Sequence, residues 1–536
     1  LSKIQKERRP AMKRVNELYL GFSDATNYSQ RGNKELFNHI FVKNHFLDEI
    51  LEPSRYFLIG EKGTGKTAYA TYLSISNYKE NSARNQFISA TDYEKFYKLK
   101  NQNQLDLTDY EGIWKVIMLL IVSKTISEDD SITSKFNKSN VKQLITAIQD
   151  YYNNAFSPEI TTVMKVMDDS EAVAKIISKV VEIGGGIKNS TEYTETKFQH
   201  NLYYIEHNFE ENISNLKINK DLTIFIDGID IRPDSIPYND YIDCIRGLVH
   251  ATWYLNTSLF SNIRDSKGHI KIVLLLRPDI FNALNLQNAT NKLMDNSVFL
   301  DWRTTYATYQ NSDLYRIGNQ LLTYGQESFE GDIFEEYFPW KLNPSSIDRE
   351  FDRAFMAFLK ISLSRPRDIL VIMQNLKKCM TNRSIGESET FSLDVFESDE
   401  FQNIYSTYFM SSLKDQLSFY YSHEDYSHFL RFFDFFDKPD FTFDEYKESY
   451  DNFIDYILDN ANDIPVFVDD PKRLLQLLYE SNIIAAKKRD NNNKYYLNFS
   501  YREKDSSNVN PQVPIGENIS YRFHYGLYKK NNMGRY

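Results

Sequence analysis

The chain has 536 residues, enough for about three to four domains, and its 63 basic and 74 acidic residues give a formal net charge of −11. This balance excludes a global basic field that would recruit nucleic acid or an anionic membrane surface. The only cysteines, Cys244 and Cys379, argue against a disulfide framework or a thiolate metal site, and no apolar run approaches the ~20 residues that span a bilayer, so a reducing, cytoplasmic location is expected.

The first third of the chain predicts a parallel sheet. Residues 1–50 begin with basic residues and then show helical spacing, which predicts a lead-in helix before the first strand. The apolar run 56–59 predicts a buried strand, and residues 68–78 predict the helix that follows it. Residues 86–90 predict a second strand. The order strand, helix, strand favours an α/β fold.

A glycine-rich turn links the first strand to its helix and has the spacing G-x-x-x-x-G-K-T of a phosphate-binding loop. Its glycines permit backbone conformations in which successive N–H groups point at an anion. The lysine supplies a cation to the phosphates and the threonine hydroxyl binds Mg²⁺, so ATP and Mg²⁺ are the expected ligands. The alternative is a plain glycine turn. The residues of this turn are Gly60, Glu61, Lys62, Gly63, Thr64, Gly65, Lys66 and Thr67.

A long helical insertion is expected at about residues 111–217, before the core resumes. A triple glycine at 184–186 interrupts it, either as a hinge or as a helix terminator, and termination is favoured. The helices expected within the insertion span residues 113–126, 141–152, 158–183 and 192–216.

The core resumes with the apolar run 222–227, which predicts a buried strand ending in Asp227. At this position an aspartate helps to hold Mg²⁺, and a second polar group orients the attacking water. Asp230 is the candidate for that second role, because position 228 is glycine and has no side chain. The alternatives are a strand-ending turn for Asp227 and a helix or turn cap for Asp230.

A further buried strand is predicted up to Arg277, after a helix at 241–260. If this strand lies between the two strands that end near Gly60 and at Asp227, Arg277 emerges close to the γ-phosphate and can register its presence. The alternative is a surface arginine before a proline that stops the strand. Residues 298–302 predict a fifth strand, which closes the core near residue 305.

Amphipathic helices follow at 313–324 and 349–361, and a third begins around Pro366. Arg365 and Arg367 therefore lie at a helix start, where a cation gains nothing from the helix dipole. Contact with the nucleotide phosphates would explain them, and solvated arginines are the alternative.

The last section has the outline of a winged helix, with helices followed by a β-hairpin. At the expected wing tip lie Lys487, Lys488 and Arg489, where DNA-binding winged helices contact phosphates. The preceding helix has only two basic residues, so the pattern favours a protein-contact or packing role over DNA binding. The expected helices are 394–414, 428–436, 443–460 and 471–481, and the expected strands are 483–489, 494–499 and 519–525.

Together these features resemble the AAA+/STAND branch of P-loop ATPases, in particular bacterial members with a helical lid and a C-terminal winged helix. The resemblance covers roughly residues 20–530. In such families a basic residue after the fourth core strand, here Arg277, and one in the lid, here Arg365 or Arg367, sense the nucleotide. The implied domains are an N-terminal lead-in at 1–50, an ATPase core at 51–305, a helical lid at 306–390 and a winged-helix-like domain at 391–536.

The resemblance implies a slow, switch-like ATPase, because the usual Asp-Asp or Asp-Glu pair is replaced by Asp227-Gly228. It also implies bacterial anti-phage or mobile-element systems as the setting. We expect a homo-oligomer with a protein effector, in which a neighbouring subunit supplies Arg246, Arg264 or Arg303 to the nucleotide. The alternatives are an ATP-controlled DNA-binding initiator or regulator and a scaffold with a structural nucleotide.

Overall fold

The computed structural model divides the chain into two compact units. The parallel-sheet unit contains His45–Gly60 and Lys66–Phe299, and the antiparallel-sheet unit contains Leu1–Asn44, Glu61–Gly65 and Leu300–Tyr536. The residues described by the structure are 12–88, 109–133, 138–154, 195–287, 289–326, 331–342, 353–461, 464–489, 495–505, 508, 510–516 and 518–528. The expected helix at 158–183, the triple glycine and the turn of the expected hairpin at 490–493 lie outside these residues.

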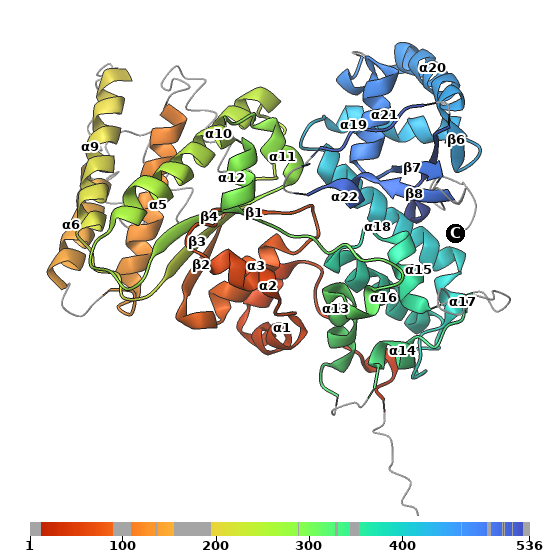
Figure 1. Cartoon of the computed structure of the whole chain (residues 1–536), viewed down its shortest axis with the longest axis horizontal. Helices are drawn as coiled ribbons and strands as arrows, with labels where there is room; N and C mark the ends of the chain where they lie inside the picture. Colours follow the sequence, from red (N-terminus) through yellow and green to blue (C-terminus); the bar gives the residue numbers. More distant parts are fainter. Residues whose placement is uncertain are drawn as a thin grey trace, which may run out of the picture. The chain divides into compact units, whose positions relative to one another are not determined.

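A five-stranded sheet forms the core of the parallel-sheet unit (Figure 1). Its strand order is β2-β3-β4-β1-β5, and every neighbouring pair is parallel. β4 therefore lies between β1 and β3, which confirms the arrangement on which the prediction for Arg277 depends. The strands are β1 (Phe57–Ile59), β2 (Ser82–Phe87), β3 (Leu222–Asp227), β4 (Ile270–Leu276) and β5 (Ser297–Phe299).

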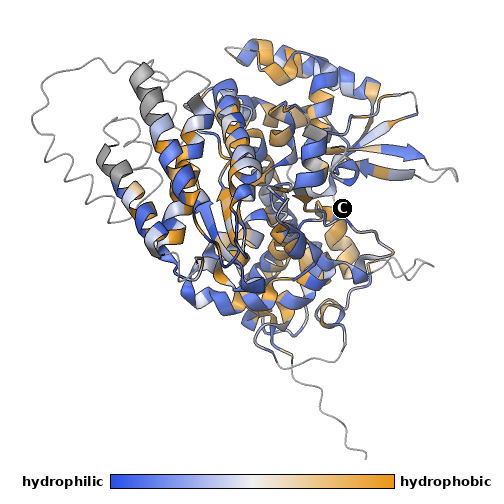
Figure 2. Cartoon of the chain, turned by 60° about the vertical axis from the view of Figure 1, so that its left-hand side comes forward, coloured by the Kyte–Doolittle hydropathy of each residue, from blue (hydrophilic) through white to orange (hydrophobic). Residues whose placement is uncertain are grey.

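The three inner strands β1, β3 and β4 are buried along their whole length, as their continuous apolar runs predict. Helices pack around them, and in Figure 2 these helices carry hydrophobic and hydrophilic residues in alternation, as expected of helices with one buried face. The helices of this unit are α2 (His45–Leu51), α3 (Lys66–Ile75), α5 (Asp109–Glu128), α6 (Lys138–Asn154), α9 (Glu195–Ser214), α10 (Tyr238–Tyr254), α11 (Pro278–Ala283) and α12 (Ala289–Asn296).

The antiparallel-sheet unit begins with α1 (Lys34–Ile40) and continues with a group of helices rich in aromatic side chains. Phe334, for example, packs its ring against Tyr315, Phe338, Phe355 and Phe358. The helices of this group are α13 (Asp313–Thr323), α14 (Ile333–Tyr337), α15 (Ala354–Ile361), α16 (Pro366–Asn382), α17 (Leu393–Phe396) and α18 (Asp399–Leu417).

The C-terminal part of the same unit combines helices with a four-stranded antiparallel sheet of order β6-β9-β7-β8. The predicted hairpin is confirmed as β7 paired with β8, and β9 pairs with the other side of β7. Within the described ranges, no helix has the length and apolar character needed to cross a lipid bilayer. The elements are α19 (His423–Arg431), β6 (Asp440–Thr442), α20 (Phe443–Asn460), α21 (Pro471–Glu480), β7 (Ile484–Arg489), β8 (Tyr495–Phe499), α22 (Ser500–Glu503) and β9 (Ser520–Phe523).

A buried histidine follows β9 and predicts a pH dependence of stability. The His524 ring lies 4.7 Å from the Phe409 ring and 4.9 Å from the Phe499 ring, and Nδ1 accepts a hydrogen bond from Gly526 N. Burial lowers the pKa of His524 from 6.5 to about 3. The folded state therefore requires the neutral ring, and this contribution to stability is complete above pH 6.5 and falls as the pH drops from 6.5 towards 3.

We expect the free energy of unfolding to fall by up to ~1.4 kcal/mol per pH unit from this one group. The measurement is denaturant unfolding at pH 7, 6 and 5 of the wild type and of His524→Asn, which keeps an acceptor but does not titrate. The difference between the two proteins should shrink as the pH falls. A difference that stays constant over this range would contradict the assignment.

Candidate functional site

Residues 60–67, which we call the glycine loop, connect the C-terminal end of β1 to the start of α3. Gly60 N donates to Leu276 O on β4 at 3.1 Å, so the loop begins where the central strands end. Gly63 and Gly65 have φ angles of +89° and +98°, which L residues with side chains rarely adopt. A Cβ at position 63 would also lie 3.3 Å from Arg367 Cβ. The glycines are therefore required by the path of the loop.

Lys66, Thr67 and Asp227 come together in the parallel-sheet unit. The buried Lys66 begins α3 and donates from Nζ to Gly60 O at 2.8 Å. Thr67 Oγ1 donates to Asp227 Oδ2 at 2.7 Å, and Gly228 N donates to Asp227 Oδ1 at 2.8 Å. The hydroxyl at the start of α3 and the carboxylate at the end of β3 are oxygen ligands that suit Mg²⁺.

The Asp227 carboxyl is 6% exposed, and burial raises its pKa, against the lowering effect of the Thr67 hydrogen bond. The negative charge of Asp230 raises this pKa further, so the structure also brings the second candidate carboxylate near the first. Burial therefore disfavours the ionised form of Asp227 in the unliganded protein, and a nearby cation would stabilise that form.

Gly228 cannot be replaced by an acidic residue without a change in the backbone. Its φ angle is +88°, and a Cβ there would lie 2.2 Å from Ile88 O. Ile88 N in turn donates to Asp227 O at 2.9 Å, which fixes the two segments against each other. The absence of an acidic pair is therefore built into this edge of the sheet.

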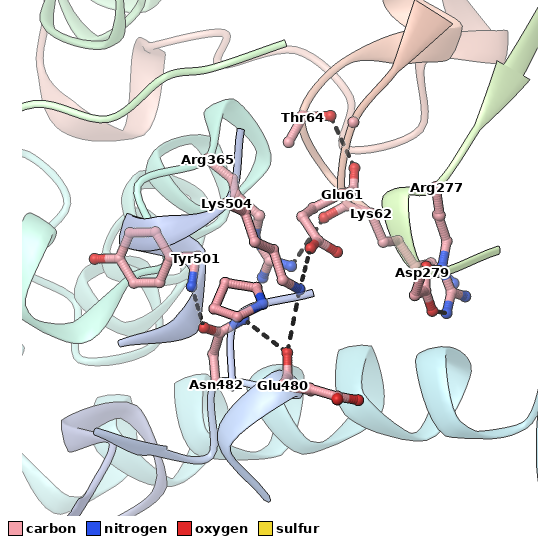
Figure 3. A network of polar contacts seen from close by, with 12 residues as sticks. Glu61, Lys62, Thr64, Arg277, Asp279, Arg365, Glu480, Asn482, Tyr501 and Lys504 are labelled. Carbon is pink, nitrogen blue, oxygen red and sulfur yellow. Dashed lines mark hydrogen bonds and ion pairs between the residues drawn. The ribbon is translucent and has the colours of Figure 1, made fainter. Parts of the chain in front are cut away.

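Arg277 is 1% exposed, so the alternative of a surface arginine is wrong. It follows β4 directly and is the N-cap residue of α11, with Pro278 as the first helical residue. Its Nε donates to Asp279 Oδ1 at 3.0 Å, and its Nη2 pairs with the other oxygen of the same carboxylate (Figure 3). The structure places Arg277 at the carboxyl end of the strand, as predicted, and its sensor role stays a prediction.

The tip of the glycine loop, residues 61–65, belongs to the antiparallel-sheet unit. There Arg365 Nη1 donates to Lys62 O at 2.8 Å, and Arg367 N donates to Gly63 O at 3.3 Å. The buried Lys504 forms an ion pair with Glu61 at 2.6 Å and also donates to Glu480 O (Figure 3). Arg365 and Arg367 therefore contact the loop through its backbone carbonyls.

Two residues of this arrangement were not singled out from the sequence. Trp302 Nε1 donates to Thr64 O at 2.8 Å, although residues 298–302 were considered only as a strand. Lys504 lies in a polar segment of the sequence whose residue spacing indicates no role. In both cases the partner is distant in the chain, and a single hydrogen bond leaves no periodic signal.

Arg365 is buried, so the alternative of a solvated arginine is wrong at this position. Its Nε and Nη2 donate to the two oxygens of Asp368 at 2.9 and 2.8 Å. Asp368 also accepts hydrogen bonds from Tyr408 Oη and Leu363 N. Burial lowers the pKa of Arg365, but the charge of Asp368 outweighs this and raises it, so the guanidinium stays ionised. Arg367 is half-buried, and its contact with the nucleotide phosphates stays a prediction.

The basic residues of the expected wing tip have partners within the chain. Lys487 Nζ lies 3.6 Å from an Asp440 oxygen, and Lys488 Nζ lies 3.9 Å from a Glu503 oxygen. The Arg489 guanidinium lies 4.6 Å from the centre of the Tyr495 ring. These neighbours compensate part of the charge that DNA contacts would use, and DNA binding stays a prediction.

Among the arginines expected to act on a neighbouring subunit, two are held by their own chain. Arg246 pairs with Asp243 and donates to Leu284 O, and Arg303 pairs with Asp301 and donates to Arg502 O. Arg264 is exposed. Of the three, Arg264 is therefore the one whose side chain is most accessible to a partner.

Nothing in the described part of the chain groups three or more His, Cys, Asp or Glu side chains around a metal position. Comparison with protein-family models, with curated proteins and with solved structures finds no match to this chain. The fold itself, a parallel α/β sheet with helices and β4 between β1 and β3, is compatible with a P-loop NTPase.

Proposed function

We propose that this chain binds ATP with Mg²⁺ at the glycine loop and hydrolyses it slowly, as a switch. The observation that carries the proposal is the link from Thr67 to Asp227, because it joins the start of α3 to the end of β3 beside a loop with two left-handed glycines. A plain glycine turn requires neither the buried Lys66 nor the buried carboxylate.

Each residue then has a defined task. The Lys66 ammonium neutralises phosphate charge, and the N–H groups at the start of α3 face the phosphates with the positive end of the helix dipole. Thr67 and Asp227 supply oxygen ligands for Mg²⁺, which neutralises phosphate charge when bound. Asp230 is the carboxylate available to orient water, because position 228 has no room for a side chain. This single displaced carboxylate is the reason to expect slow turnover.

The wider assignment rests on the family resemblance alone. It describes a homo-oligomeric ATPase switch with a helical lid and a C-terminal winged helix, controlling a protein effector in a bacterial anti-phage or mobile-element system. The pairing of Lys487 and Lys488 with carboxylates does not favour a separate function in DNA binding.

Asp227→Asn tests the proposal, because it separates stability from function. The amide retains an acceptor for Gly228 N. It also removes a buried carboxyl whose pKa is raised, and ionisation of that carboxyl destabilises the folded protein as the pH increases. We expect the unliganded variant to be at least as stable as the wild type, whereas Mg²⁺-dependent ATP turnover falls about 100-fold.

The control is Asp234→Asn, at an exposed position of the same unit, which should leave turnover unchanged. The measurements are thermal unfolding without ligand and phosphate release with and without Mg²⁺. Unchanged turnover in Asp227→Asn would remove this carboxylate from the site.

A further inference from the structure

Five successive carbonyl oxygens of the glycine loop, from residue 60 to residue 64, each accept a hydrogen bond from a side chain or from the first turn of α16. Lys66 Nζ donates to Gly60 O, and Thr64 Oγ1 donates to Glu61 O. The other three donors come from a distant part of the sequence. They are Arg365 Nη1 to Lys62 O at 2.8 Å, Arg367 N to Gly63 O at 3.3 Å and Trp302 Nε1 to Thr64 O at 2.8 Å.

These bonds determine where the N–H groups of the loop point. The described peptide bonds are trans, and across a planar trans peptide the C=O of one residue and the N–H of the next point in opposite directions. A donor that holds Lys62 O therefore directs the N–H of Gly63 to the opposite side. In the same way, the donor on Thr64 O directs the N–H of Gly65. Both glycines have the left-handed φ angles that an anion-binding loop uses.

The two side-chain donors are themselves fixed. Trp302 is 8% exposed and Arg365 is 6% exposed. Arg365 Nε and Nη2 both donate to the Asp368 carboxylate, and Tyr408 Oη donates to the same carboxylate. Donors locked in this way orient a backbone without the entropy cost of ordering a mobile side chain.

We propose that Trp302 and Arg365 are positioning residues, which hold the carbonyls of the glycine loop away from the phosphates so that the N–H groups of Gly63 and Gly65 face them. The inference rests on the proposed function, and it changes the role of Arg365 from a phosphate sensor to a support of the loop backbone.

Trp302→Phe is the direct test, and the chain offers a matched control. Trp340 is 7% exposed in the same unit, and its Nε1 donates to Phe391 O at 2.7 Å. Trp340→Phe therefore removes an equivalent buried indole hydrogen bond away from the loop. The measurement is equilibrium binding of Mg²⁺ with ATP and of adenosine to both full-length variants, with KM and kcat.

We expect Trp302→Phe to weaken ATP binding by about 3- to 10-fold and to raise KM with little change in kcat, because the phosphates are held in the ground state and in the transition state alike. Adenosine binding should not change in either variant, and Trp340→Phe should bind ATP like the wild type. Arg365→Lys, which keeps the charge but not the fork, should also weaken ATP binding.

Equal ATP affinities in Trp302→Phe and Trp340→Phe would overturn the positioning role while leaving the proposed function intact. An absence of ATP binding in the wild type would overturn both. If Trp302→Phe does not fold, Arg365→Lys decides the question, and wild-type affinity in that variant counts against the proposal.

Discussion

Lys66→Ala is expected to weaken ATP binding by about 10- to 100-fold and to abolish detectable turnover, because a hydrogen bond to a charged group contributes about 1.5–3 kcal/mol. The Lys66 ammonium is buried at the start of α3 and donates to Gly60 O in the unliganded loop. Its position on the loop places a positive charge where the proposed phosphates lie. The measurement is ATP binding and phosphate release by the purified full-length variant.

The control for this variant is Lys267→Ala, which removes an exposed lysine of the same unit. It should bind and hydrolyse ATP like the wild type. Folding of Lys66→Ala is checked by its unfolding temperature, since the variant loses the hydrogen bond to Gly60 O. Unchanged ATP affinity in a folded Lys66→Ala protein would be incompatible with the proposed site.

Gly228→Ala is expected to destabilise the parallel-sheet unit by about 3 kcal/mol or more. The φ angle of +88° strains any L side chain, and the new Cβ would lie 2.2 Å from the backbone oxygen of Ile88. Gly228→Glu, which would place a second acidic residue beside Asp227, should be at least as unstable. It should therefore not yield a faster enzyme.

Thermal unfolding of both variants tests this, with Gly32→Ala as the control. A Cβ at position 32 meets no other atom within 4 Å, so this substitution should leave the unfolding temperature almost unchanged. A stable Gly228→Glu protein with faster ATP turnover would refute the steric explanation for the missing carboxylate.

The parallel sheet could be predicted from the sequence wherever its strands are buried on both faces. β1, β3 and β4 are continuous apolar runs, and their boundaries follow from them. β2 begins at Ser82, whereas the sequence predicted a strand only at 86–90. The start of this edge strand was missed because it is formed largely by polar residues such as Arg84 and Asn85. Hydrophobic patterning cannot detect such a strand.

Arg277 and Arg365, each the N-cap residue of a helix, show what local sequence patterns can and cannot reveal. Arg277-Pro278-Asp279 and the segment from Arg365 to Asp368 each place an arginine before a helix whose first turn contains an aspartate. In the structure each arginine forms an ion pair with that aspartate. Burial excludes the solvent-exposed alternative for both arginines, and contact with the nucleotide phosphates stays a prediction.

The contacts that hold the loop tip could not be predicted from one sequence. Glu61 and Lys504 are 443 residues apart, and Thr64 and Trp302 are 238 residues apart. No periodicity or motif connects such pairs, because each depends on the folded path of the chain between them. The loop itself was recognisable from its glycines and lysine, whereas its supports were not.

Calorimetric titration of ATP into the full-length chain, with and without Mg²⁺, tests the central claim most directly. We predict saturable binding of one ATP per chain, strengthened by Mg²⁺ and weakened about 10- to 100-fold in Lys66→Ala. No saturable binding at millimolar ATP, or equal binding by the wild type and Lys66→Ala, would contradict the assignment of the glycine loop as the nucleotide site.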